Sequence, residues 1–303
     1  MSFCVFDHKK PRTYVPGSGN GVRVQAFELV IIVFSMPDAT ITGLFIYPVK
    51  SFGGIALSSS EVESRGLKYD RRWMLVDEEG VFMTQRSDTR LALFRTGIEA
   101  DGLRLRNPSG EEFILPLEPE GGCRTVQVWK DTCRAIQVAD AVDAWLSDSL
   151  DKRCSLVYMP DDSIRQTNLD FTRPGDKVSF ADGFPVLVIG ESSLEDLNSR
   201  LEQPLPLNRF RGNIIVRGWE PFAEDRWPKI SIGDLTLRAA KQCGRCGVTT
   251  TNQDTGEVGV EPLKTLADYR KFGNGVMFGT HFVPELEGVV SVGDVVVPTE
   301  ATD

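Results

Sequence analysis

Short apolar segments separated by turn residues fill most of the chain after Thr40. The turns between these segments carry Gly80, Gly102 and Asn107-Pro108, and Glu78-Glu79-Gly80 is typical of a hairpin loop. Strands that are this short and this closely spaced favour an antiparallel barrel or sandwich. The predicted strands cover 41–49, 60–63, 73–77, 81–85, 103–106, 113–115, 213–217, 235–239 and 295–297.

Helical spacing of apolar residues interrupts this pattern in a few places. The segment 139–150 predicts a helix with acidic residues in its first turn, which suits the helix dipole. A second helix is predicted over 192–201 with Ser192 or Ser193 as its N-cap, and a short amphipathic one over 263–269. The expected fold class is therefore mainly β with a few helices, a β-rich α+β fold.

The first 38 residues differ from the rest. They are polar and turn-rich up to Gly21, and the apolar run 29–34 is far shorter than the roughly 18 residues that a membrane span needs. Basic residues precede this run, so a signal peptide stays open, as do a disordered tail, an edge strand and a native start at Met36. We predict that 1–38 is a disordered or non-native extension and that the chain has no stable membrane span.

Length and charge narrow the class of protein. A chain of 303 residues is long enough for two domains, which we predict over 39–150 and 151–303. The formal net charge of −9 argues against nucleic-acid binding, which needs a basic face. Two histidines, His8 and His281, are too few for a multi-histidine metal site. Six cysteines are too sparse for a disulfide scaffold, so a reducing compartment and a cytoplasmic location are expected.

No familiar enzyme motif is present, but cationic residues recur at strand ends beside glycines or hydroxyls. Arginine and lysine in such places can bind a phosphate through charge-assisted hydrogen bonds and open backbone amides. Each one taken singly also fits a solvated charge at a strand end. The positions concerned are Lys50-Ser51, Asp70-Arg71-Arg72, Arg209 to Asn213, and Arg245.

Cys246 stands out because Arg245 precedes it and hydroxyl residues follow. A neighbouring cation favours the thiolate, which binds soft metals or acts as a nucleophile. The competing interpretation is a small buried core cysteine. Cys243 and Cys246 form a C-x-x-C pair, but no second pair completes a four-cysteine zinc site.

A series of short motifs occurs in order along the chain. The motifs are Tyr47 to Ser51, Asp70 to Trp73, Ser193 to Asn198, Phe210 to Ile214, Arg245 to Thr250, Asp254 to Gly256, Glu261 to Leu263 and Val292 to Asp294. This series resembles the MOSC-domain family, and within it the branch of the mitochondrial amidoxime-reducing component and its bacterial relatives. The resemblance runs from about Ile41 to Val297. It implies an N-terminal MOSC β-barrel domain followed by the MOSC domain, with a molybdopterin-type molybdenum cofactor between them.

The resemblance also implies site residues. Cys246, rather than Cys243, falls on the position of the metal-ligating cysteine. Two departures are Gly244 and Gly183, which stand where mammalian relatives carry hydroxyl residues, so side-chain contacts are lost there. The implied cofactor-binding positions are Lys50, Ser51, Arg71, Arg211, Asn213, Gly244, Arg245 and Cys246.

The implied activity is reduction of N-hydroxylated compounds, such as hydroxylamines, amidoximes and N-hydroxylated bases, by oxygen-atom transfer to molybdenum. A separate donor of the ferredoxin, flavoprotein or cytochrome b5 type would supply electrons, since the sequence has no four-cysteine cluster for an iron–sulfur centre. The alternatives are a MOSC sulfur carrier and a molybdenum cofactor carrier without reductase activity. Pyridoxal phosphate is only a family-level association, because no site for it is found in the sequence.

Overall fold

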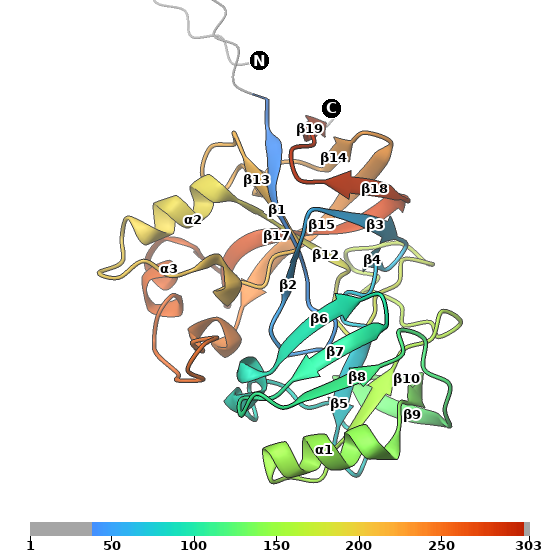
Figure 1. Ribbon diagram of the computed structural model, residues 1–303. Helices are drawn as coiled ribbons and strands as arrows, with labels where there is room; N and C mark the ends of the chain where they lie inside the picture. The colour runs from blue at the N-terminus through green and yellow to red at the C-terminus, as the bar shows by residue number, and fades with distance from the viewer. Residues whose placement is uncertain (1–37, 300–303) are drawn as a thin grey trace, which may run out of the picture. The chain divides into compact units, whose positions relative to one another are not determined.

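The computed structural model of the chain describes residues 38–299, and in this range the fold is mainly β, as predicted. The predicted extension lies outside the described residues except for Asp38, as do its apolar run 29–34 and Met36. Within the described range, the largest sheet has nine strands, in the order β19-β14-β15-β17-β12-β13-β1-β2, with β16 on β17 (Figure 1). Its strands are β1 (Thr40–Ile46), β2 (Ile55–Leu57), β12 (Val186–Gly190), β13 (Ile214–Arg217), β14 (Lys229–Ile232), β15 (Leu235–Arg245), β16 (Lys271–Phe272), β17 (Gly275–Leu286) and β19 (Val297–Thr299).

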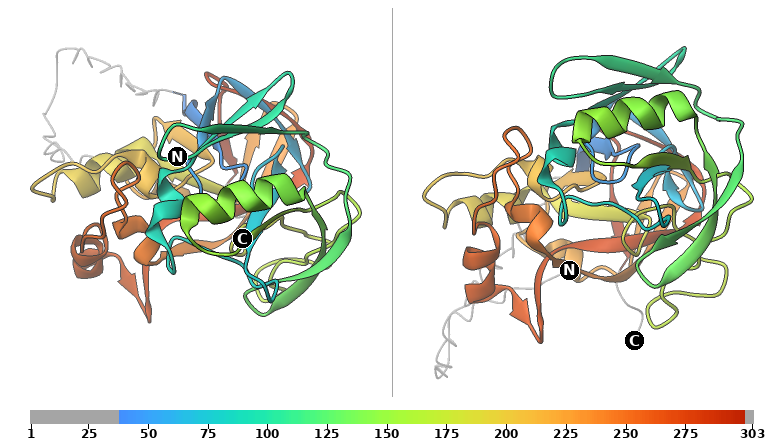
Figure 2. Two further views of the ribbon diagram at one scale, coloured as in Figure 1. Left: turned by 60° about the horizontal axis from the view of Figure 1, so that its bottom comes forward. Right: turned by 90° about the horizontal axis from the view of Figure 1, so that it is seen from below.

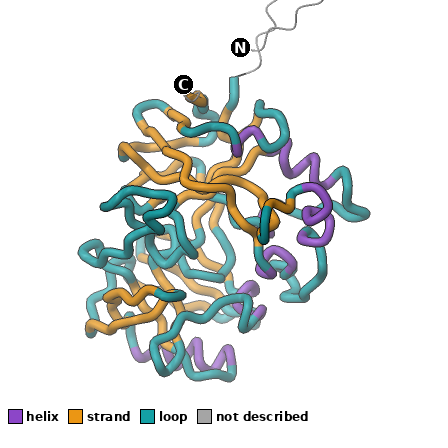
Figure 3. The backbone as a smooth tube through the Cα atoms, turned by 180° about the vertical axis from the view of Figure 1, so that it is seen from behind, coloured by secondary structure: helices purple, strands orange, loops and turns teal. Residues whose placement is uncertain are grey.

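Both faces of the nine-stranded sheet are covered by apolar side chains. One face carries a cluster that includes Ile41, Val188 and Phe282. The other packs beneath α2 (Glu191–Asn198) and α3 (Leu263–Tyr269), which lie on one flank in Figures 1 and 3. Burial on both faces explains why these strands are apolar runs rather than strict alternations.

One small sheet joins an early segment to a late one beside the large sheet, and the middle of the chain forms two more small sheets below it (Figure 1). Helix α1 (Asp140–Leu150) lies across the strands here, as Figure 2 shows, and buries Val142 and Leu146 against Leu103 and Leu105. The sheets are β5 (Trp73–Val76), β11 (Ser155–Tyr158), β10 (Asp131–Gln137) and β9 (Cys123–Val128); β6 (Arg95–Glu99), β7 (Gly102–Arg106) and β8 (Glu112–Leu115); and β18 (Gly288–Ser291), β3 (Ser59–Glu63) and β4 (Gly66–Leu67). Short 3-10 helices are η1 (Thr89–Leu93), η2 (Leu207–Arg209), η3 (Ala223–Asp225) and η4 (Gly247–Thr250).

Strand pairing joins segments from the two halves of the sequence. Strand β1 pairs with β13, and β3 pairs with β18, so early strands complete sheets built from late ones. Strand β11 follows α1 and pairs with both β5 and β10. The predicted domain boundary at 150/151 falls just before β11, and the boundary stays a prediction.

Three local predictions were wrong. The segment 81–85 forms isolated bridges instead of a strand, because it folds back tightly at a turn in which Asp77 accepts from the Val81 amide. Helix α2 begins at Glu191 with Gly190 as its N-cap, since the Ser193 hydroxyl is taken up by the buried Glu224 carboxylate. Strand β15 runs on to Arg245, far past the predicted end, because bulges keep it paired along β17.

Candidate functional site

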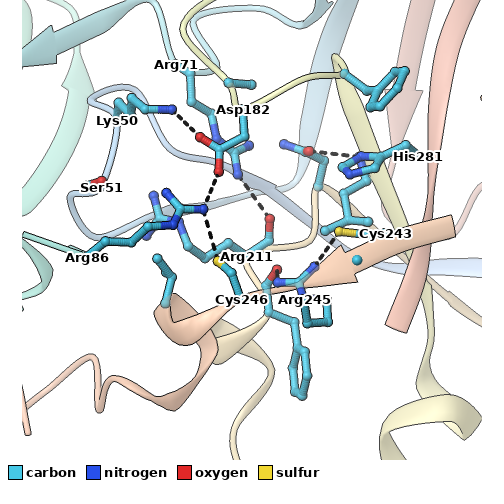
Figure 4. Close-up of a pocket in the computed structure, with 17 residues that line it drawn as sticks. Lys50, Ser51, Arg71, Arg86, Asp182, Arg211, Cys243, Arg245, Cys246 and His281 are labelled. Atoms are coloured by element: carbon cyan, nitrogen blue, oxygen red, sulfur yellow. Dashed lines mark hydrogen bonds and ion pairs between the residues drawn. The ribbon is translucent and has the colours of Figure 1, made fainter. Parts of the chain in front are cut away.

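One pocket, with a volume of about 160 Å³, gathers all eight residues that the sequence predicted for the site (Figure 4). They arrive from the loop after β1, the turn before β5, the segment before β13 and the end of β15. The remaining lining residues include four with polar or reactive side chains, Arg86, Asp182, Cys243 and His281. The fold therefore brings together groups up to 231 positions apart, from Lys50 to His281. Their roles as ligands stay predictions.

The pocket carries more positive than negative charge. Asp182 is the one carboxylate among its lining residues, against a lysine and four arginines. The Lys50 ammonium is buried and donates to the Phe180 carbonyl at 2.7 Å and to Asp182 at 2.5 Å. Burial lowers the Lys50 pKa to about 8, although Asp182 opposes this. A pocket with surplus cations of this kind favours an anionic ligand.

Three predicted site residues have backbone conformations that favour glycine. The φ angles of Ser51, Arg71 and Arg211 are 72°, 51° and 54°. Such strain persists where the surrounding structure holds it, and it clusters at binding sites. Here the Arg71 and Arg211 guanidinium carbons lie 4.3 Å and 4.2 Å from the centre of the Tyr47 ring, so one aromatic ring supports both cations.

Gly212 has a different role from the one expected. Its place beside Arg211 predicts close approach of the backbone to a ligand. A Cβ on Gly212, however, would lie 2.7 Å from the Ile189 side chain and within 3.3 Å of the Ile215 side chain. Gly212 therefore makes room for core packing. Among the described residues, Arg211 forms no ion pair with Asp182, because Asp182 binds Lys50 and Arg86.

Two arginines of the pocket present buried donors that no group within residues 38–299 accepts. Arg211 donates through Nη1 to the Phe52 carbonyl at 2.7 Å, while its buried Nη2 has no partner in the described part of the chain. Burial, followed by the charge of Arg71, lowers the Arg211 pKa to about 10. Arg245 donates to the Phe210 carbonyl at 2.7 Å, and its buried Nε also lacks a partner. Unsatisfied buried donors are costly, so these atoms fit a phosphate-bearing ligand.

Two thiols line the same pocket. Cys246 directly follows β15 and precedes η4, and the Arg86 Nη2 lies 3.0 Å from its Sγ. Cys243 is buried, and Arg245 Nη1 donates to its Sγ at 3.0 Å. Burial raises the Cys243 pKa, but Arg245 and His281 outweigh it and bring the value to about 6. Both sulfurs are thus held beside arginine, and a thiolate is the form that ligates soft metals.

Asn213 and Gly244 contribute differently from the charged residues. The Asn213 side chain accepts from the Leu187 amide at 3.0 Å and donates to the Phe45 carbonyl at 3.1 Å. It therefore ties β12 and β1 together at the pocket, whatever else it binds. Gly244 is exposed, and a Cβ there would meet only the Met277 sulfur at 3.8 Å.

Sequence reasoning missed Arg86, Asp182, Cys243 and His281 as pocket residues. Arg86 follows the segment 81–85, so the rule of cations at strand ends would have found it. His281 lies near no candidate nucleophile in sequence, but the pairing of β15 with β17 brings it to the Cys243 side of the pocket. Asp182 carries no local signal, because its two ion-pair partners come from distant loops.

Asp182 gives a prediction on stability. Burial raises the pKa of this carboxyl, but Lys50 and Arg86 outweigh it and hold the pKa well below its ordinary 3.8. A depressed pKa stabilises the fold above the ordinary value and loses that contribution as the pH falls. We expect Asp182→Asn to destabilise the protein at about pH 7 and only somewhat less at about pH 3, because at pH 3 the unfolded carboxyl is mostly protonated while the folded carboxylate is still charged. Urea unfolding of both proteins at the two pH values measures this, and an equal gap at both would contradict it.

Comparisons with known proteins agree with the site and fold. Residues 38–153 match the MOSC N-terminal beta barrel domain, and residues 175–297 match the MOSC domain. These matches define a protein built from two MOSC modules. The chain is 37% identical to mitochondrial amidoxime-reducing component 1 of Mus musculus, across 84% of this chain and 81% of that protein. The Homo sapiens protein of that name is 33% identical with the same coverage. The chain therefore belongs to the MOSC-domain family that includes the amidoxime-reducing components, as its motifs predicted.

A second group of relatives shares only part of its length with this chain. The molybdenum cofactor sulfurase of Oryza sativa subsp. japonica is 30% identical over 81% of this chain, but the match spans 32% of that protein. The chain thus covers about a third of the sulfurase. Separately, the helices described between residues 38 and 299 include none with the length and apolarity to cross a membrane.

Proposed function

We propose that the protein is a molybdenum-dependent oxidoreductase that reduces N-hydroxylated compounds, with the molybdenum cofactor held in the pocket of Figure 4. The observation that carries this is the meeting of unpartnered buried guanidinium donors with a thiol in one pocket. Relatives named amidoxime-reducing components support the reaction class. When bound, the cofactor supplies the two-electron chemistry that removes oxygen from an N-hydroxyl group.

Different residues of the pocket would bind different parts of such a cofactor. Arg211 and Arg245 offer free N–H groups to a phosphate, and Arg71 adds charge beside them. Lys50 is positioned at the same pocket by Asp182. The Cys246 sulfur would be the soft donor for molybdenum. Arg86 bridges that sulfur and Asp182, at 3.0 Å and 2.9 Å, and so fixes the orientation of the ligand.

The electron supply is a further part of the proposal. A separate electron-transfer protein, of the ferredoxin, flavoprotein or cytochrome b5 type, would restore the reduced site after each turnover. The names of the Mus musculus and Homo sapiens relatives include "mitochondrial", so a mitochondrial location competes with the predicted cytoplasmic one.

One structural observation favours the alternative function of a sulfur carrier. Cys243 has a pKa of about 6, and a thiol ionised near neutral pH can hold sulfur as a persulfide. Cyanide-labile sulfur on the protein would support sulfur transfer. Tight cofactor binding without turnover would support a cofactor carrier.

One experiment tests the proposal directly. The protein is produced in a host that synthesises the molybdenum cofactor, and its molybdenum and pterin contents are measured. The sample is then given a chemical reductant with hydroxylamine or an amidoxime. We expect stoichiometric molybdenum and formation of ammonia from hydroxylamine or of the amidine from the amidoxime, with water as the other product. Full molybdenum occupancy without reduction of any N-hydroxylated compound would contradict the reductase function.

A further inference from the structure

A second cavity lies beside the site and has no role in the mechanism above. Its volume is about 770 Å³, within the size range of small-molecule pockets and far larger than the first. Phe82, Trp129 and Leu169 provide apolar walls, and Gln166 and Asn168 provide hydrogen-bonding groups. This composition is typical of a site for a flat organic molecule.

Trp129 is held in this cavity at a conformational cost. Val128 pairs with Asp131 across β9 and β10, so Trp129 and Lys130 form a two-residue hairpin loop. The φ of Trp129 is 57°, at the first loop position, where a turn with positive φ favours glycine. The indole is 42% exposed, with the Phe82 ring 4.8 Å away. A large aromatic kept in a strained and exposed place points to a ligand role.

The cavity adjoins the thiol site at two side chains. Asp182 lines both cavities. The Arg86 guanidinium carbon lies 4.8 Å from the Trp129 ring centre, and the same guanidinium contacts Cys246 Sγ at 3.0 Å. A molecule that binds beside Trp129 is therefore separated from the Cys246 end of the first pocket by the Arg86 side chain alone.

We propose that this second cavity binds the flat organic part of the N-hydroxylated substrate, stacked on Trp129, with the N-hydroxyl group directed toward Cys246. The inference rests on the function proposed above. Asp182 is paired with Lys50 and Arg86, and Asp131 with Arg165, so neither carboxylate of the cavity is free for a cationic group. The cavity thus favours uncharged aryl amidoximes and N-hydroxylated bases over cationic substrates.

Binding is tested without turnover. Benzamidoxime is titrated into the protein as purified, with no reductant, and tryptophan fluorescence is recorded. The control is Trp145→Phe, because Trp145 lies on α1 and packs against Phe94 and Phe113. We expect saturable quenching in the wild type and in Trp145→Phe, and its loss in Trp129→Phe. Unchanged quenching in Trp129→Phe would overturn the assignment.

Kinetics with two substrates provides the second test. Trp129→Gly removes the ring and suits the strained turn, so folding is preserved. Trp129→Gly should lower kcat/KM for benzamidoxime about tenfold and leave that for hydroxylamine, which carries no ring, within about twofold.

The two proposals fail in different ways. Equal losses for hydroxylamine and benzamidoxime, at unchanged molybdenum content, would overturn the substrate cavity and leave the reductase intact. Reduction of neither compound by the wild-type, molybdenum-loaded protein would overturn the reductase. Binding in the fluorescence titration is independent of that outcome, and it would still identify the cavity as an aryl-binding site.

Discussion

Replacing Cys246 with serine is expected to abolish molybdenum retention and reduction of N-hydroxylated compounds, while the unfolding transition stays near that of the wild type. A serine hydroxyl is protonated at neutral pH and is a hard oxygen donor, so it cannot replace a thiolate on molybdenum. The fold should tolerate the change, because the side chain is only partly buried and the Cys246 carbonyl still accepts from Thr249. Molybdenum analysis, an activity assay and thermal unfolding measure the three effects.

Cys243→Ser is the matched control in the same C-x-x-C pair. Its hydroxyl can still accept from Arg245, which now donates to the Cys243 sulfur, so a mild loss of activity is expected. Equal damage from both substitutions would contradict the assignment of Cys246 as the ligand. It would indicate instead that the two thiols act together.

The pattern of strands and helices could be predicted because the local spacing of apolar and polar residues indicates it. The helix over 263–269 has the predicted bounds, and 139–150 differs by one residue at its start. The true length of β15 could not be predicted, since its last residues are held by pairing with β17 across bulges. Strand β1 likewise finds its partner, β13, more than 160 positions away, and no local pattern encodes that choice.

The candidate site could likewise be predicted only in part: its residues could be predicted, but the contacts between them could not. Cations beside turns drew attention to Lys50, Arg71, Arg211 and Arg245, and the motif resemblance added Ser51, Asn213 and Gly244. What could not be predicted is how the charges balance one another. The ion pairs of Asp182 join residues from three separate loops, and the sandwich of two arginines on Tyr47 depends on positive φ angles at both. Such contacts exist only after the chain has folded.

Arg211→Ala is expected to weaken cofactor retention about tenfold to a hundredfold. The guanidinium keeps one buried N–H without a protein partner, and a hydrogen bond from such a group to a charged phosphate contributes about 1.5–3 kcal/mol. Arg211→Lys should recover only part of the affinity, because an ammonium lacks the planar fork of a guanidinium. Molybdenum content after extended dialysis measures retention. Arg153→Ala, an exposed arginine remote from the pocket, is the control.

The cofactor-free protein should respond little to the same substitution, and this separates a binding role from a structural one. In the wild type, folding buries the Arg211 cation beside Arg71. Both the burial and the charge of Arg71 disfavour the charged form of Arg211 and lower its pKa. Removing the side chain relieves this cost, which offsets the lost hydrogen bond to the Phe52 carbonyl and the lost packing on Tyr47. The melting temperature of the apo-protein should therefore stay close to that of the wild type. A sharp fall in that temperature, together with normal cofactor occupancy, would show that Arg211 holds the fold and not the ligand.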